Sequence, residues 1–137
     1  YLTPESIIRA MDGGDFYATT GVVLEDIQFD GKTLKVEIKP EIGVSYTTRF
    51  IGTLKGCDLT SKPVIDANGV EIHTTQIYSG DIGRVLAEVK GTAAGYTCTG
   101  NEIYVRAKII STKAKHNAAT AGEVEVAWVQ PVIPKSR

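Results

Sequence analysis

The chain has 137 residues, of which 42% are hydrophobic and 23% are charged, and this composition is ordinary for one globular domain. Its 15 basic and 16 acidic residues nearly cancel, so no strong positive field is present to attract a nucleic acid, and we expect no nucleic-acid partner. No apolar run approaches the roughly 20 residues that span a bilayer, so we expect no membrane partner either. The chain opens on Tyr1 and not on Met, which suggests a processed or excised chain. The compartment therefore stays open, export included, because processing of this kind removes targeting segments.

Residues 1–14 predict a short helix. Thr3 is a favourable N-cap, Pro4 suits the first helical position, and Gly13-Gly14 ends the helix because glycine readily takes the left-handed C-terminal conformation. The apolar residues of this helix recur at helical spacing and share one face: Ile7, Ile8 and Met11.

The remaining chain changes to a period of two, which is typical of antiparallel strands with one side exposed to water. Three segments alternate in this way, at residues 32–39, 102–109 and 124–128. The apolar set of each segment is expected to face the core: Leu34, Val36 and Ile38 in the first, Ile103, Val105, Ala107 and Ile109 in the second, Val124, Val126 and Trp128 in the third. On the third segment, Glu123 and Glu125 are expected to face solvent.

Turn residues separate these strands. Asp30-Gly31, Asn68-Gly69 and Gly100-Asn101 each lie between two β-runs, the first two as hairpin turns. With seven or eight short strands, the pattern indicates a β-sandwich or a closed Greek-key barrel. We predict a mainly β fold, an antiparallel, Greek-key-like β-sandwich of one domain over residues 1–137, with one short N-terminal helix. Residues 113–122 are expected to form the longest loop and residues 132–137 a tail.

The two cysteines allow two arrangements. Cys57 and Cys98 can pair and close a loop of about 40 residues, which would stabilise the fold by roughly 4 kcal/mol. The alternative is two separate buried thiols, since free cysteine is among the most buried residue types.

We find no motif for catalysis, a metal or a cofactor. His73 and His116 have no ligand spacing with each other or with the cysteines, and the serines lie in no nucleophile motif. Paired carboxylates are the remaining alternative, as an acid–base pair or a calcium site, although solvated strand faces and turns account for most of them. The candidates are Glu25, Asp26, Glu71, Asp81, Glu123 and Glu125.

Tyr104 and Arg106 are the candidate ligand-binding residues. They lie on the polar side of the strand at residues 102–109, where an exposed tyrosine beside an arginine suits carbohydrate stacking or a protein interface. The alternative is structural, with the two side chains covering the sheet or the arginine paired with a glutamate.

Four segments together resemble one family. They read LTPESIIRAM at residues 2–11, GDFYATTG at 14–21, IYVRAK at 103–108 and AWVQPV at 127–132. In this order they resemble the β-rich region that follows the catalytic barrel in metal-dependent phosphoesterase-like proteins of the PHP (polymerase and histidinol phosphatase-like) type. The resemblance implies a C-terminal accessory β-sandwich, whose partner is the upstream catalytic domain of the same polypeptide.

None of that family's metal-ligand motifs occurs here, so the resemblance transfers no catalytic residue and no cofactor to this chain. The leading hypothesis is a non-catalytic domain whose N-terminal helix docks on the barrel. Its candidate contact residues are Ile7, Ile8, Met11, Phe16 and Tyr17. The alternative hypothesis is a carbohydrate- or ligand-binding module centred on Tyr104 and Arg106, and a hydrolase with its own carboxylate pair ranks last.

Overall fold

The computed structural model describes residues 2–135, and it contains one helix and ten strands in that range. In chain order the elements are α1 (Pro4–Gly13), β1 (Tyr17–Thr19), β2 (Leu24–Phe29), β3 (Thr33–Ile38), β4 (Tyr46–Leu54), β5 (Ser61–Ile65), β6 (Glu71–Tyr78), β7 (Arg84–Lys90), β8 (Ala93–Thr97), β9 (Glu102–Ala114) and β10 (Val124–Val129). The mainly β fold that the sequence predicts is confirmed, with more strands than the seven or eight expected.

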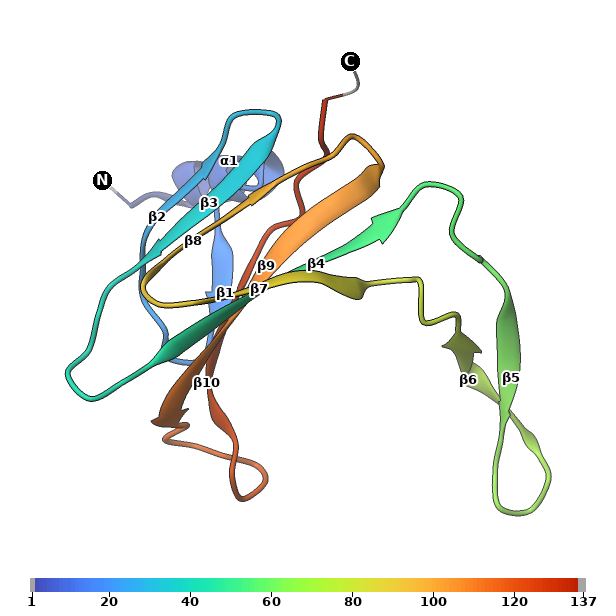
Figure 1. The fold of residues 1–137 in the computed structure, drawn as a ribbon. Helices are drawn as coiled ribbons and strands as arrows, with labels where there is room; N and C mark the ends of the chain where they lie inside the picture. Colours follow the sequence, from blue (N-terminus) through green and yellow to red (C-terminus); the bar gives the residue numbers. More distant parts are fainter. Residues whose placement is uncertain (1, 136–137) are drawn as a thin grey trace.

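The strands form two packed sheets and a separate hairpin (Figure 1). One sheet has five strands in the order β1-β10-β9-β4-β7, the other has three in the order β2-β3-β8, and every pairing is antiparallel. The chain crosses between the two sheets after β1, β3, β7 and β8, as a Greek-key-like sandwich requires. The hairpin β5–β6 forms its own two-stranded sheet.

The core lies between the facing sides of the two sheets. Leu34, Val36 and Ile38 of β3 are buried against the long strands β4 and β9, as their alternation predicts. Across the layers, the rings of Phe50 and Tyr96 stack with their centroids 5.6 Å apart. This single apolar cluster between two sheets confirms the sandwich.

The turns explain how the strands connect. Asp30 begins the β2–β3 turn, where its carboxylate accepts hydrogen bonds from the backbone N–H of Lys32 and Thr33. Asp66 does the same for Asn68 and Val70 in the β5–β6 turn. Both hairpin predictions are therefore confirmed, whereas Gly100-Asn101 connects β8 in one sheet to β9 in the other.

The predicted core face of β10 is wrong by one residue. Ala127 and Val129 face the core together with Glu125, whereas Val124, Val126 and Trp128 lie on the outer side of the sheet, half-buried. Alternation gives the period of a strand but not which side is the interior. Here the small Ala127 lies directly between the sheets, and the Trp128 ring is covered instead by Lys108, whose Nζ lies 5.4 Å from the ring centroid.

A smaller correction concerns the start of β9. Val105, Ala107 and Ile109 are fully buried as predicted, but Ile103 is 46% exposed. The preceding residue, Glu102, takes the buried position, because hydrogen-bond donors of the neighbouring loop surround its carboxylate.

Part of the predicted tail, residues 132–135, contacts the sandwich through backbone hydrogen bonds. Val132 pairs with Val105 by two backbone hydrogen bonds, and the Lys135 N–H donates to the carbonyl of Gly31. The last two positions of that predicted tail, 136–137, and position 1 of the predicted helix segment lie outside the described residues.

Candidate functional site

Helix α1 is a well-formed helix that begins and ends as its sequence predicts. The Thr3 hydroxyl accepts the Ser6 N–H at 3.2 Å, and the Ser6 hydroxyl accepts the Thr3 N–H at 2.9 Å, which completes a capping box. Gly14 ends the helix in the left-handed conformation, with φ of 72°. The local sequence therefore specifies where this helix begins and ends.

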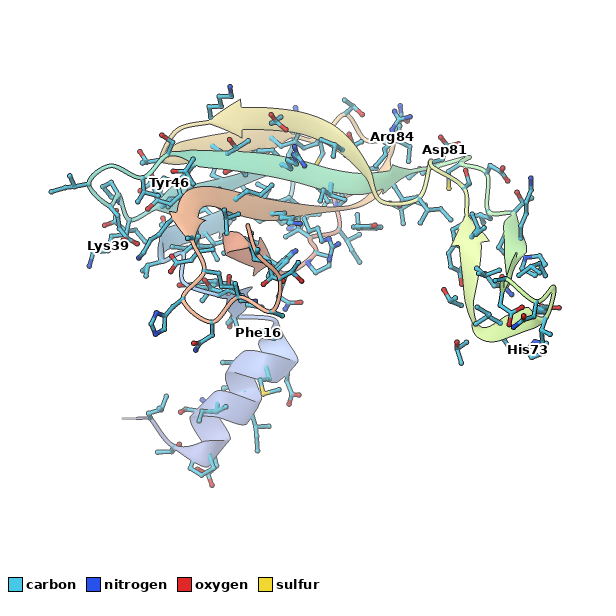
Figure 2. The ribbon with its side chains drawn as sticks, turned by 90° about the horizontal axis from the view of Figure 1, so that it is seen from below. Phe16, Lys39, Tyr46, His73, Asp81 and Arg84 are labelled. Carbon is cyan, nitrogen blue, oxygen red and sulfur yellow. The ribbon has the colours of Figure 1, made fainter. Side chains whose placement is uncertain are left out.

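No residue of α1 is buried. Ile8 is 58% exposed and Met11 is 60% exposed, with Ile7 beside them on the same face. The charged residues lie on the other side of the helix: Glu5, Arg9 and Asp12. Figure 2 shows α1 standing away from the sandwich, with Phe16 at the junction. We call the exposed set Ile7, Ile8 and Met11 the apolar face of α1.

The other two predicted contact residues differ from each other. Phe16 is exposed next to the helix, so it extends the apolar face of α1 toward the sandwich. Tyr17 begins β1, packs against the core, and accepts the Leu24 N–H on its hydroxyl at 3.2 Å. The ring of Tyr17 therefore contributes mainly to this domain's own fold.

The hairpin β5–β6 is a second projecting element, which sequence reasoning did not single out. In Figure 2 it extends beyond Asp81 and Arg84, away from the sandwich. Cross-strand pairs place Val64, Ile72 and Ile77 on one face of the hairpin, and no residue of β6 is buried. Nothing in its alternation distinguishes it from a strand pair of the sandwich, so its projection was not predictable from the pattern.

The predicted ligand-binding residues lie on the outer side of the five-stranded sheet, half-buried. The Tyr104 hydroxyl lies 3.3 Å from the Thr53 hydroxyl, which donates to it. The Nε of Arg106 is buried without a hydrogen-bond partner in the described part of the chain. Farther along the same side, the register aligns Trp128, Lys108, Arg49 and Glu88 across four strands, and Arg49 and Glu88 form a 2.7 Å ion pair.

The candidate carboxylates lie in separate parts of the fold. Asp26 accepts a hydrogen bond from Gln28, Glu71 lies on the projecting hairpin, Asp81 lies at its base, and Glu25 is exposed in β2. Glu123 pairs with Lys115 at 3.0 Å, and this hydrogen bond lowers the pKa of Glu123. No side-chain hydrogen bond joins two of these six carboxylates within residues 2–135.

One of the candidates, Glu125, is buried where solvent exposure was expected. Lys113 lies 3.5 Å from it and 2.7 Å from Glu41, so one ammonium group bridges two carboxylates. The Glu125 side chain also packs against the backbone of Gly21, where an added Cβ would lie 2.1 Å from the carboxyl carbon. Glu125 thus has a structural environment with its charge compensated.

The histidines and cysteines form neither a metal site nor a disulfide among the described residues. Across residues 2–135 no cluster of three or more His, Cys, Asp or Glu side chains could hold a metal ion. His73 lies 3.7 Å from Glu71 on the exposed hairpin, and His116 is exposed in the β9–β10 loop. Cys57 and Cys98 are both free thiols, so the disulfide alternative is not formed. Cys98 is the buried one, and burial raises the pKa of its thiol.

No helix among the described residues is long and apolar enough to cross a membrane. Comparison with known proteins adds no relative to these observations: no family model matches the chain, and neither the curated proteins nor the solved structures contain a match.

Proposed function

We propose that this chain is a non-catalytic accessory domain that docks through α1 on a catalytic domain of a larger PHP-type, hydrolase-like protein. The observation that carries the proposal is the apolar face of α1, which is exposed on a helix that is fully capped. The identity of the partner is proposed from the resemblance of four ordered segments to the region after the barrel of that family.

The physical argument concerns the stability of a short helix. A ten-residue helix is marginal alone in water, because most helix stability in proteins comes from packing an apolar face. Here the sandwich does not supply that packing. Burying an Ile or Met side chain contributes about 1.5–3 kcal/mol when it is complete, so a partner that covers these residues would gain several kcal/mol.

The position of the helix supports docking on a domain that precedes the sandwich in the chain. Residues 14–16 connect α1 directly to β1 at the edge of the five-stranded sheet. A partner that covers α1 would also meet Phe16, which is exposed at this junction. The apolar face of α1 and Phe16 together form one surface of the kind that domain interfaces bury.

The test has two steps. The first is to read the coding sequence before the codon for Tyr1, where we expect a barrel domain with histidine and aspartate metal ligands. The second is to produce that domain separately and to measure its binding to this chain by titration calorimetry. An Ile8→Asp/Met11→Asp variant is expected to lose at least tenfold in affinity, because two buried apolar contacts become charged.

The matched control is Glu5→Gln/Arg9→Gln, which changes the polar side of the same helix and is expected to bind as the wild type does. An unrelated upstream sequence would remove the family assignment. Equal binding by the Ile8→Asp/Met11→Asp variant would show that α1 is not the docking element.

The second candidate function is carbohydrate or ligand binding at Tyr104 and Arg106. One observation favours it: Trp128, expected in the core, lies instead on the same outer side of the sheet, beside Lys108. Aromatic rings and cations on an open sheet face suit stacking against a sugar. A glycan panel tests this function, with Tyr104→Ala and Trp128→Ala expected to remove any binding, and no binding by the wild type would count against it.

A further inference from the structure

Three chain segments meet at one end of the sandwich and form a pocket of about 790 Å³. They are the β2–β3 turn, the β8–β9 connection and the C-terminal segment. The lining residues are Asp30, Gly31 and Lys32 of the first, Thr97 to Asn101 of the second, and Pro134 and Lys135 of the third. This volume lies within the range of about 300–1,000 Å³ that small-molecule sites occupy. In Figure 1 the β2–β3 turn and the β8–β9 connection lie at the same end of the sandwich.

The walls of this pocket are fixed by hydrogen bonds. The buried Glu102 carboxylate holds the β8–β9 connection, accepting from the N–H groups of Thr99 and Gly100, both at 3.0–3.1 Å. Asp30 holds the β2–β3 turn in the same way. The Lys135 N–H donates to the Gly31 carbonyl at 3.0 Å, which ties the third segment to the first. These hydrogen bonds within the chain fix the shape of the pocket, and a preformed site lowers the entropic cost of binding a ligand.

Of the three charged residues that line the pocket, two are basic. Lys32 and Lys135 line it, and neither forms a salt bridge within the described chain. Outside the lining, the Lys55 Nζ donates to the Gly100 carbonyl at 2.9 Å and holds the β8–β9 connection. Of the two nearby carboxylates, Glu102 is buried, and Asp30 already accepts two backbone hydrogen bonds. Two exposed ammonium groups are therefore available to a ligand.

We propose that this pocket binds a small molecule through an oxyanion, either a phosphate or a carboxylate group. Lys32 and Lys135 supply the charge, and the Asn101 side chain, also at the surface, supplies a neutral hydrogen-bond donor. Most backbone N–H groups around the pocket already have partners, so the lysines carry the affinity. Because these lysines are exposed, binding is weak and falls as the salt concentration rises.

The test is an amide NMR titration of this chain with inorganic phosphate, with succinate, and with glucose as a neutral probe. Either phosphate or succinate is expected to shift the amide resonances of Gly31, Cys98 and Gly100 in a saturable way, and glucose is expected to leave them unchanged. Which of the two anions binds more tightly distinguishes a phosphate from a carboxylate ligand.

Variants complete the test. Lys32→Gln/Lys135→Gln is expected to weaken anion binding by roughly tenfold, as the loss of two exposed ion pairs implies. Lys62→Gln/Lys90→Gln removes the same charge far from the pocket and is expected to bind as the wild type does. The proposal is overturned if neither anion gives saturable shifts, if the Lys32/Lys135 variant binds unchanged, or if glucose binds as well as the anions do.

Discussion

Glu102 is the residue whose chemistry the fold constrains most. Its carboxylate is almost fully buried and accepts hydrogen bonds from the Tyr96 hydroxyl at 2.8 Å, from the Thr99 hydroxyl at 2.9 Å, and from two backbone N–H groups. Burial alone would raise the pKa of Glu102, but the hydrogen bonds from Thr99 and Tyr96 together outweigh it and hold the pKa at about 2. Burial and the bond to Glu102 raise the pKa of Tyr96 to about 12.

We predict that replacing the Glu102 carboxylate lowers the free energy of unfolding, and that this loss depends on pH. Glu102→Gln is expected to destabilise the fold by about 2 kcal/mol at neutral pH, because its amide presents donors to the N–H groups of Thr99 and Gly100. The folded-state pKa of about 2 lies below the usual value of 4.5, so the carboxylate stabilises the fold above pH 4.5 and loses this effect as the pH falls toward 2. Urea unfolding at neutral pH and at about pH 3 measures both effects.

The variant itself is the control for the pH dependence. Between those two pH values the wild type is expected to lose more stability than Glu102→Gln does, since the variant has no carboxylate to protonate at this position. Equal losses in the two proteins would contradict the role assigned to Glu102.

At Gly52, near the end of β4, we predict a steric effect of substitution. A Cβ at Gly52 would lie 2.5 Å from the Tyr104 carbonyl oxygen and 2.8 Å from Leu86, so Gly52→Ala is expected to cost about 2 kcal/mol or more. Gly80→Ala is the matched control: a Cβ there meets nothing within 4 Å, and we expect a change of less than about 0.5 kcal/mol. Thermal unfolding compares the two variants, and similar midpoints would contradict the close approach at Gly52.

For single residues, the sequence predicts caps and turns better than it predicts which side chains are buried. The roles of Thr3, Asp30 and Gly14 follow from hydrogen bonds or backbone angles within a few residues, so their neighbours in the chain suffice to predict them. The interior side of β10 depends on which neighbour each strand meets across the sheets. For this reason Trp128 and Glu125 exchange the positions that alternation assigns to them.

Among the elements, α1 is the one that the sandwich stabilises least. Its capping box is local, and none of its residues is buried. The helix should therefore unfold and reform without the sandwich, as elements with few buried contacts do. The same independence leaves α1 available to a partner, which connects its dynamics to the docking proposal.

Thr3→Ala tests this independence. Loss of the N-cap is expected to cost the helix about 1 kcal/mol, which lowers the helical signal in circular dichroism. The urea midpoint of the sandwich is expected to stay unchanged, because α1 packs on no strand of it. Thr112→Ala is the converse control: the Thr112 hydroxyl accepts the Ser45 N–H at 3.0 Å, so this variant should shift the midpoint and leave the helix intact.

Hydrogen exchange gives a second measurement of the same prediction. In the isolated chain the amides of residues 7–13 of α1 are expected to exchange far faster than those of β9. Protection of α1 equal to that of β9 would show that the helix is stabilised by contacts with the sandwich.

At the scale of the whole molecule, the two sheets form one core from which two elements project. The sequence predicts the sandwich because its strands are amphipathic, and it predicts α1 because the caps are local. It does not predict that β5–β6 projects, because the residue pattern of two paired strands does not show whether another sheet covers them. An isolated two-stranded hairpin is marginally stable in water, so β5–β6 also is a candidate for contact with a partner.

We predict that the sandwich still folds when the hairpin β5–β6 is removed. Residues 59–80 contain the hairpin and lie within the connection from β4 to β7. These two strands pair directly with each other, so a short Gly-Ser linker can replace residues 59–80. Shortening a loop changes its closure entropy by less than about 1 kcal/mol, and no residue of β5 or β6 belongs to the core. The shortened protein is therefore expected to unfold cooperatively at nearly the same urea midpoint, with the amide spectrum of β9 and β10 unchanged. Loss of cooperative unfolding would mean that the hairpin stabilises the sandwich, and its exposed apolar face would then be explained within this chain.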